Sequence, residues 1–256
     1  MRIPTKMQQA LARALSTITF LAACVAGTAH ANVIITGTRV IFPGNDSEVS
    51  VKLDNVGELP ALVQTWIDTG DVHAAPNAAD APFVIMPPVF RMEPGKGQTL
   101  RLMYTKEPLP QDRESVFWLN VLDIPPKPKS EADANLLQMA FRSRIKIFFR
   151  PNGLDAEGAL QAPSLVSWTL VKDDNGKYVV EGSNPTAYCV NVPTLQVKSG
   201  GRAYDAVDGG MILPGSSLRF PIKDMTIKPA TTPEFSYSFV NDYGVVVESK
   251  GQVTLQ

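Results

Sequence analysis

The chain has 256 residues, 44% of them apolar, and its 24 basic and 25 acidic side chains nearly cancel. That length allows one large domain or two ordinary ones. So mild a charge balance gives no support for nucleic-acid binding.

The first 31 residues have the pattern of a secretory signal peptide. Arg2, Lys6 and Arg13 make a basic start, and an apolar run follows at 14–27. After it come Ala29, His30 and Ala31, a small-x-small cleavage site. We expect an exported mature chain that begins at Asn32, carries 21 basic and 25 acidic residues (a net charge of −4), and has no later stretch able to span a bilayer.

Strand-like runs dominate the mature chain up to residue 149. Several are short and separated by turn residues, which is typical of a β-sandwich. The expected strands are 33–42, 48–53, 61–67, 83–86, 99–104, 115–124 and 136–149.

A second series of strands follows a turn at 151–153. An Asp-Asp-Asn-Gly sequence at 173–176 predicts a tight hairpin turn between the first two. No convincing amphipathic helix is found. We therefore predict two all-β domains, 32–152 and 153–256, and the short connection favours a fixed angle with a cleft between them. The expected strands are 164–170, 177–181, 187–192, 195–198, 217–220, 235–241 and 245–255.

Residues 136–151 (LLQMAFRSRIKIFFRP) form the most unusual run. Alternate positions are apolar with one exception, giving one continuous face: Leu137, Met139, Phe141, Ser143, Ile145, Ile147 and Phe149. The run is much longer than a usual strand of five or six residues. It is either a central strand or a device for adding a strand to a partner protein.

Motifs for catalysis or cofactor binding are not found. His30 leaves with the leader, and a single His73 with a single Cys189 cannot build a familiar zinc site. There is no glycine-rich phosphate loop and no nucleophile elbow. We expect no enzyme activity, no cofactor and no metal. Cys189 is either a buried, inert thiol or a group with a redox or intermolecular role.

Two basic residues interrupt apolar strand runs. Arg39 lies between apolar residues at 33–35 and 40–42, and Lys146 lies between Ile145 and the run 147–149. Both could point to solvent from the outer face of a sheet. Alternatively, both line the cleft and bind an anion, since a lysine point charge and an arginine fork together suit a carboxylate.

Three motifs carry a resemblance to a known family. They are residues 109–126 (LPQDRESVFWLNVLDIPP), 145–151 (IKIFFRP) and 241–244 (NDYG). The mature chain resembles the periplasmic pilus-assembly chaperones of the chaperone–usher pathway. This resemblance implies two immunoglobulin-like domains in an L or boomerang arrangement with a cleft. It also implies pilus or fimbrial subunits and an outer-membrane usher as partners, and donor-strand complementation as the mechanism.

The resemblance also implies roles for particular residues. Leu137, Met139 and Phe141 would be the donor residues that enter subunit pockets, and Arg39 and Lys146 would anchor the subunit's C-terminal carboxylate. The anchor would set the register of strand addition.

A third set of residues matches an interdomain ionic network of the family: Glu114, Arg150 and Asp242. The alternative is that these three are independent surface charges. The loop at 127–135 is short, and its flanks carry no cysteine, so the chain resembles the short-loop members of the family.

Other functions compete with that of a chaperone. A structural pilus subunit or adhesin is the main alternative, although such subunits usually have one domain with a disulfide. An enzyme or small-molecule binder using the cleft is the third. Nucleic-acid binding and membrane insertion are not expected, whereas an apolar strand edge leaves self-association of the free protein open.

Overall fold

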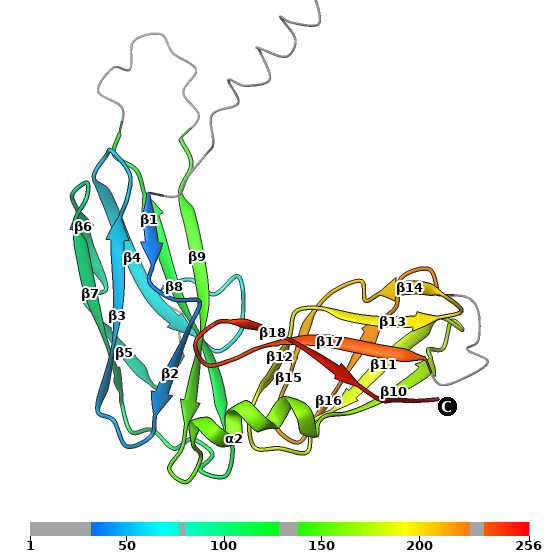
Figure 1. Cartoon of the computed structure of the whole chain (residues 1–256). Coiled ribbons are helices and arrows are strands. Elements are labelled where there is room, and N and C mark those ends of the chain that lie inside the picture. Colours follow the sequence, from blue (N-terminus) through cyan, green and yellow to red (C-terminus); the bar gives the residue numbers. More distant parts are fainter. Residues whose placement is uncertain (1–31, 77–79, 128–137, 226–232, 256) are drawn as a thin grey trace, which may run out of the picture. The chain divides into compact units, whose positions relative to one another are not determined.

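The computed structural model describes residues 32–76, 80–127, 138–225 and 233–255 (Figure 1). These described residues belong to one compact unit and contain nineteen strands, one short α-helix and one 3-10 helix. The predicted all-β class is confirmed. No helix in the described ranges is long and apolar enough to cross a membrane.

The first nine strands form two facing sheets. The strand order is β1-β3-β7-β5 in one sheet and β2-β9-β8-β4-β6 in the other. The strands are β1 (Val33–Ile35), β2 (Arg39–Pro43), β3 (Glu48–Asn55), β4 (Ala61–Asp68), β5 (Phe83–Met86), β6 (Val89–Met92), β7 (Gly97–Tyr104), β8 (Ser115–Ile124) and β9 (Phe141–Arg150).

The predicted strand at 33–42 is wrong in its continuity, because the chain changes sheets within it. β1 pairs antiparallel with β3, whereas β2 pairs parallel with β9 in the other sheet. Gly37 lies at the crossing with a φ of +98°, a conformation that glycine adopts without steric cost. The short strand β6 was not predicted, since it has only four residues and directly follows two prolines.

Alternate residues of these strands fill a core between the two sheets. In β3 and β7, Val51 lies opposite Leu100, and both side chains are buried. Phe149 of β9 packs with Phe42, Phe83 and Tyr104 in an aromatic cluster. The two-residue periodicity of the sequence is therefore the periodicity of burial.

The rest of the chain builds a second sandwich. Its sheets have the orders β16-β11-β10-β19, β14-β13-β17-β18 and β12-β15. Its elements are α2 (Ala156–Gln161), η1 (Ala162–Leu165), β10 (Ser167–Lys172), β11 (Tyr178–Ser183), β12 (Val190–Val192), β13 (Leu195–Ser199), β14 (Arg202–Asp205), β15 (Gly210–Ile212), β16 (Ser217–Pro221), β17 (Glu234–Val240), β18 (Val246–Gly251) and β19 (Val253–Leu255).

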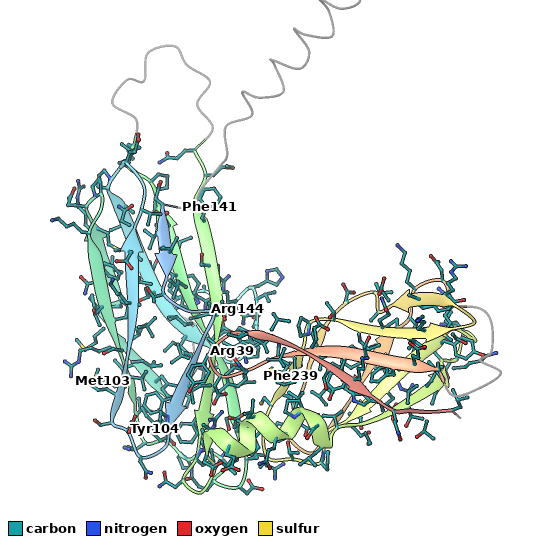
Figure 2. The ribbon with its side chains drawn as sticks, viewed as in Figure 1. Arg39, Met103, Tyr104, Phe141, Arg144 and Phe239 are labelled. Atoms are coloured by element: carbon teal, nitrogen blue, oxygen red, sulfur yellow. The ribbon has the colours of Figure 1, made fainter. Side chains whose placement is uncertain are left out.

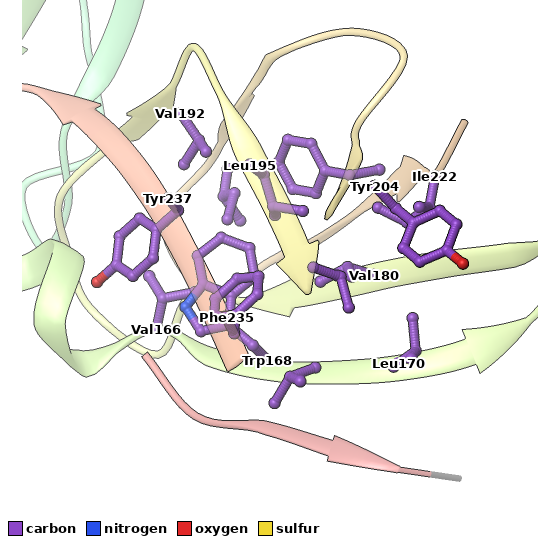
Figure 3. Packing of buried hydrophobic residues seen from close by; sticks show 14 of the residues in the cluster. Val166, Trp168, Leu170, Val180, Val192, Leu195, Tyr204, Ile222, Phe235 and Tyr237 are labelled. Atoms are coloured by element: carbon purple, nitrogen blue, oxygen red, sulfur yellow. The ribbon is translucent and has the colours of Figure 1, made fainter. Parts of the chain in front are cut away.

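A separate hydrophobic cluster stabilises this second sandwich (Figure 3). Trp168 lies at its centre, with ring centroids 5.0 Å from Tyr237, 5.2 Å from Phe235 and 5.9 Å from Phe220. The first sandwich has its own cluster of buried residues. Two cores in one chain are what the predicted two-domain fold requires.

Several local predictions for the second sandwich are wrong. The helix α2 was not expected, and it carries no amphipathic signal because none of its residues is buried. Asp155 caps it by accepting a hydrogen bond from the Gly158 amide. The strand expected at 164–170 begins at Ser167 because the 3-10 helix η1 precedes it. The run at 245–255 is divided between β18 and β19, and the short strands β14 and β15 were not predicted.

Candidate functional site

Strand β9 has two differently paired halves. Its residues from Lys146 to Phe149 lie between β8 on one side and β2 on the other, and Arg150 pairs with β2. From Phe141 to Ile145 the strand pairs with β8 alone, and no other described strand pairs with its second edge. The backbone of these residues therefore presents an open edge (Figure 1).

The predicted donor residues precede or begin this strand. Phe141 is the first residue of β9 and is half-buried, and Met139 lies before the strand and is 47% exposed. Leu137 lies outside the described residues. The expected strand start at 136 is wrong at residues 138–140, where the Gln138 side-chain amide instead donates to the Pro125 carbonyl at 3.0 Å.

Arg39 and Lys146 are direct neighbours in the parallel pairing of β2 with β9. The Arg39 guanidinium lies over the Phe148 ring, and its Nη1 donates to the Val240 carbonyl at 2.9 Å. Its Nε is buried and has no hydrogen-bond partner in the described structure. The Lys146 ammonium donates to Asn191 Oδ1 at 2.9 Å. Two cations thus lie side by side, and both contact residues of the second sandwich.

The charge of this pair is poorly compensated. Among the residues that the structure describes, no carboxylate forms an ion pair with either cation. Burial, and then the positive charges of Arg39 and Arg144, lower the pKa of Lys146. Burial also lowers the pKa of Arg39, although Asp242 and Glu114 partly offset it. An anion between the two would relieve this unfavourable electrostatic energy.

Glu114, Arg150 and Asp242 meet in a single ion-pair cluster. Arg150 Nε donates to Glu114 Oε1 at 2.8 Å, and its two terminal nitrogens donate to the Asp242 carboxylate at 2.7 and 2.9 Å. The second Glu114 oxygen accepts from the Cys189 amide at 2.8 Å. The cluster joins the residue before β8 and the last residue of β9 to the loops before β12 and after β17. These residues are not independent surface charges in this structure.

Burial governs the electrostatics of the cluster. Burial raises the pKa of Glu114, and hydrogen bonds from Cys189 and Arg150 offset this only in part. Burial would lower the pKa of Arg150, but the bonds to Asp242 and the charge of Glu114 outweigh it and raise the pKa. Burial and then Glu114 raise the pKa of the Cys189 thiol, which favours the inert interpretation, because the thiolate is the reactive form.

A polar network on the outer face of β9 was not predicted. Asp68 at the end of β4 is buried and accepts hydrogen bonds from Arg144 and from the Asn120 side chain. Arg142 binds Asn120 Oδ1 through two nitrogens, at 2.9 and 2.6 Å, and donates to the Val72 carbonyl at 2.7 Å. Burial would raise the pKa of Asp68, but Arg144 and Asn120 donate to the carboxylate and lower it.

Tryptophan rings extend this network. The Arg142 guanidinium lies 4.7 Å from the Trp66 ring centroid, and that of Arg144 lies 4.7 Å from the Trp118 ring centroid. Figure 2 shows Arg144 between Phe141 and the Arg39 side chain along the sheet. Each arginine is therefore held both by a flat aromatic face and by directed hydrogen bonds. Alternation in the sequence placed Arg142 and Arg144 on one face, but the partners depend on register across three strands.

A small cavity lies beside Arg39. A cavity of about 20 Å³ lies among Arg39, Glu114, Asn191 and Asp242. Such a volume holds about one water molecule. A substrate-sized molecule would not fit in this cavity, which Lys146 does not line.

Comparisons with known proteins agree with this geometry. Residues 32–155 match the family described as "Pili and flagellar-assembly chaperone, PapD N-terminal domain". Residues 161–251 match "Pili assembly chaperone PapD, C-terminal domain". Together the two matches span both sandwiches.

Individual relatives carry related descriptions. The chain is 41% identical over 226 residues to the probable fimbrial chaperone YadV of Escherichia coli, covering 87% of this chain and 90% of that one. It is 52% identical over 224 residues to a chaperone protein HifB of Haemophilus influenzae, covering 85% and 86%.

Solved structures show the same similarity. The crystal structure of the YadV chaperone matches with a TM-score of 0.74 at 36% identity, covering 87% of this chain and all of that one. The Pseudomonas aeruginosa CupB2 chaperone matches with a TM-score of 0.71 at 35% identity, covering 86% of this chain and all of that one. The similarity thus includes the arrangement of strands as well as the motifs.

Proposed function

Because the chain belongs to the PapD-type family of pili-assembly chaperones, we propose that it folds and caps pilus subunits in the periplasm by lending them a strand. The observation that carries this proposal is the open edge of β9 from Phe141 to Ile145. An exposed edge offers unpaired backbone donors and acceptors, which proteins normally cover unless a partner uses them.

The open edge fits strand addition to an incomplete subunit. A subunit strand would pair with the free backbone groups, and the donor residues Leu137, Met139 and Phe141 would enter apolar pockets of the subunit. Met139 is exposed and Phe141 is half-buried in the free protein, so both have apolar surface left to bury. Each large side chain that becomes buried stabilises the complex by roughly 1.5–3 kcal/mol.

The cationic pair lies where the open edge ends. β2 begins at Arg39 and covers β9 from Lys146 onward, so a subunit strand running along the edge must stop at these two residues. A chain terminus that stops there presents its carboxylate to Arg39 and Lys146. Each charge-assisted hydrogen bond contributes on the order of 1.5–3 kcal/mol, and the contact would select one register of strand addition.

The ion-pair cluster has a supporting role in this proposal. Glu114, Arg150 and Asp242 hold the two sandwiches, with their boundary near residues 152 and 153, so that Asn191 and Val240 stay beside the cations. Removal of one partner would leave a buried charge without compensation, at a cost of about 3–5 kcal/mol. The cluster would act on the position of the anchor and not on the subunit itself.

Export and delivery complete the proposed function. The leader at 1–31 directs the chain to the periplasm and is removed there, and the loaded chaperone passes its subunit to an outer-membrane usher. No catalytic step is needed, since binding alone stabilises the subunit.

Periplasmic co-expression with a pilin from the same operon tests the proposal. Size-exclusion chromatography should give a one-to-one complex with the wild type, and degraded or aggregated pilin with the Arg39→Ala, Lys146→Ala double variant. The matched control is Lys198→Ala with Arg202→Ala, two exposed cations on the second sandwich, and it should retain the complex.

Two results would contradict different parts of the proposal. Full subunit binding by the double variant would refute the anchor and leave strand lending intact. Circular dichroism of the purified variants is the check on folding. Failure of the folded wild type to bind any pilin of its operon would refute the chaperone function itself.

A further inference from the structure

The carboxylate of Asp123 is buried without a cation. Asp123 lies near the end of β8 and is 3% exposed. Its Oδ2 accepts from two backbone amides, those of Asn32 at 3.1 Å and Val33 at 3.3 Å. Its Oδ1 is buried and has no hydrogen-bond partner in the described structure. A buried charge with one oxygen unsatisfied is costly, so such groups are nearly always paired.

Other charged groups nearby do not supply the missing cation. Within the described ranges, no lysine, arginine or histidine lies within ion-pair distance of Asp123. On the segments that contact Asn32, Asp54 pairs with Lys52 at 3.2 Å, and Glu58 and Lys96 are exposed.

We propose that Asp123 is the binding site for the α-ammonium group that leader removal creates at Asn32. Hydrolysis of the peptide bond between residues 31 and 32 adds one water, releasing Ala31 as a carboxylate and leaving Asn32 with a protonated amine. The Asn32 backbone amide, which is neutral and donates one hydrogen to Asp123, then becomes an ammonium cation with three N–H donors. One ammonium supplies both the charge and the additional donor that Oδ1 lacks.

The surroundings hold this new terminus in place. The Asn32 carbonyl accepts from the Val56 amide at 2.7 Å, and Val33 is buried and pairs with Asn55. A Cβ atom at residue 57 would overlap the Asn32 side chain, so Gly57 lets that side chain lie against the backbone. The expected cleavage point is therefore immediately before a residue that the fold holds in place.

A functional consequence follows for export. The precursor keeps a buried carboxylate with only neutral donors, whereas the mature chain gains an ion pair that closes the start of β1 onto β8. Maturation would thus stabilise the first sandwich after leader removal. The inference depends on cleavage before Asn32 but not on strand lending, and it is tested without any pilin.

The first experiment measures the terminal amine directly. The mature protein is purified from the periplasm, its first residue is confirmed by N-terminal sequencing, and the α-amino group is titrated by NMR. In the wild type its proton affinity should exceed that of an ordinary α-amine, with a pKa of about 7.7–8.0, by about tenfold or more. In Asp123→Asn the affinity should return to that range. Equal values in both proteins, or a mature chain that starts elsewhere, would overturn the proposal.

A second variant keeps Asp123 and moves the charge. Refolded protein that begins at Ala31 has a neutral amide at Asn32 and should melt about 2–4 °C below the chain that begins at Asn32. Because the ion pair raises the amine pKa in the folded state, this difference is full below about pH 8 and disappears as the pH rises through the folded-state value. An equal melting temperature at neutral pH would contradict the ion pair even if Asp123→Asn failed to fold.

Discussion

The two halves of β9 differ in what holds them. From Ile147 to Arg150 every residue is buried, and as far as Phe149 backbone partners lie on both sides. From Phe141 to Ile145 the side chains are half-buried or exposed, and only β8 pairs with the backbone. One strand is thus committed to its own core at one end and available at the other.

The available half is residues 141–145, where no described strand other than β8 pairs with the backbone. Side-chain contacts hold it in place. Arg142 and Arg144 bind Asn120 and Asp68 and lie over two tryptophan rings. These contacts leave the backbone edge itself free, which a covering strand would not. A polar outer face can therefore keep an unpaired strand edge extended without using its hydrogen-bonding groups.

The same deletion in the two halves gives the largest contrast. Phe149→Ala removes a fully buried ring from the aromatic cluster and should lower the free energy of unfolding by about 3–5 kcal/mol. Phe141→Ala removes a half-buried ring and should cost about 1 kcal/mol. Urea denaturation of the first sandwich measures both changes.

For subunit binding, in contrast to stability, we expect the larger specific effect from Phe141→Ala. The Phe141→Ala protein is expected to stay folded and lose most of its pilin complex in co-expression. Similar losses of stability in the two variants would mean that Phe141 already belongs to the chaperone's own core. Intact pilin binding by Phe141→Ala would remove it from the donor residues.

The sequence predicted the committed half better than the available one. Alternation correctly assigned Ile147 and Phe149 to the core, and the predicted strand 115–124 matches β8 at both ends. These signals are local and repeat every two residues. The start of β9 at Phe141 was not predictable in this way, because it depends on where the pairing with β8 stops.

The candidate site shows the same limit. Resemblance named Glu114, Arg150 and Asp242, and the structure brings their side chains together. The pairing of Asp68 and Asn120 with the two arginines was not predicted, because neither residue's own strand indicates its partner. Their partners lie 76 and 22 residues away along the chain, at Arg144 and Arg142. Only the register of three neighbouring strands identifies that network.

Weakening the polar face should loosen the available half selectively. Asp68→Asn removes the charge that Arg144 binds, and we expect a loss of about 1–3 kcal/mol. Hydrogen exchange should speed up at the amides of 141–145 while those of 147–150 keep their protection. Glu181→Gln, which breaks the exposed pair with Arg219, is the matched control and should change neither.

The stability lost in Asp68→Asn should depend on pH with a definite sign. Arg144 and Asn120 lower the pKa of Asp68 in the folded protein, so its contribution is full above the unfolded value of about 3.9. It is lost as the pH falls through the lower folded value. The difference between wild type and Asp68→Asn should therefore vanish in strong acid. A difference that persists unchanged there would assign the effect to packing instead of charge.

The smallest expected effect is the pH dependence of peptide binding at Lys146, where the two halves of β9 meet. Burial and the charges of Arg39 and Arg144 lower the pKa of Lys146, and a bound carboxylate would raise it again. Binding a peptide with the subunit's C-terminal sequence should therefore take up protons at alkaline pH. Its affinity, measured by calorimetry, should fall severalfold as the pH rises above the lowered pKa of Lys146.

The same peptide with an amidated terminus should bind more weakly and show no such fall, because it offers no charge to the pair. If both peptides lost affinity equally, the pH dependence would come from elsewhere on β9, and the two cations would not be binding the terminal carboxylate.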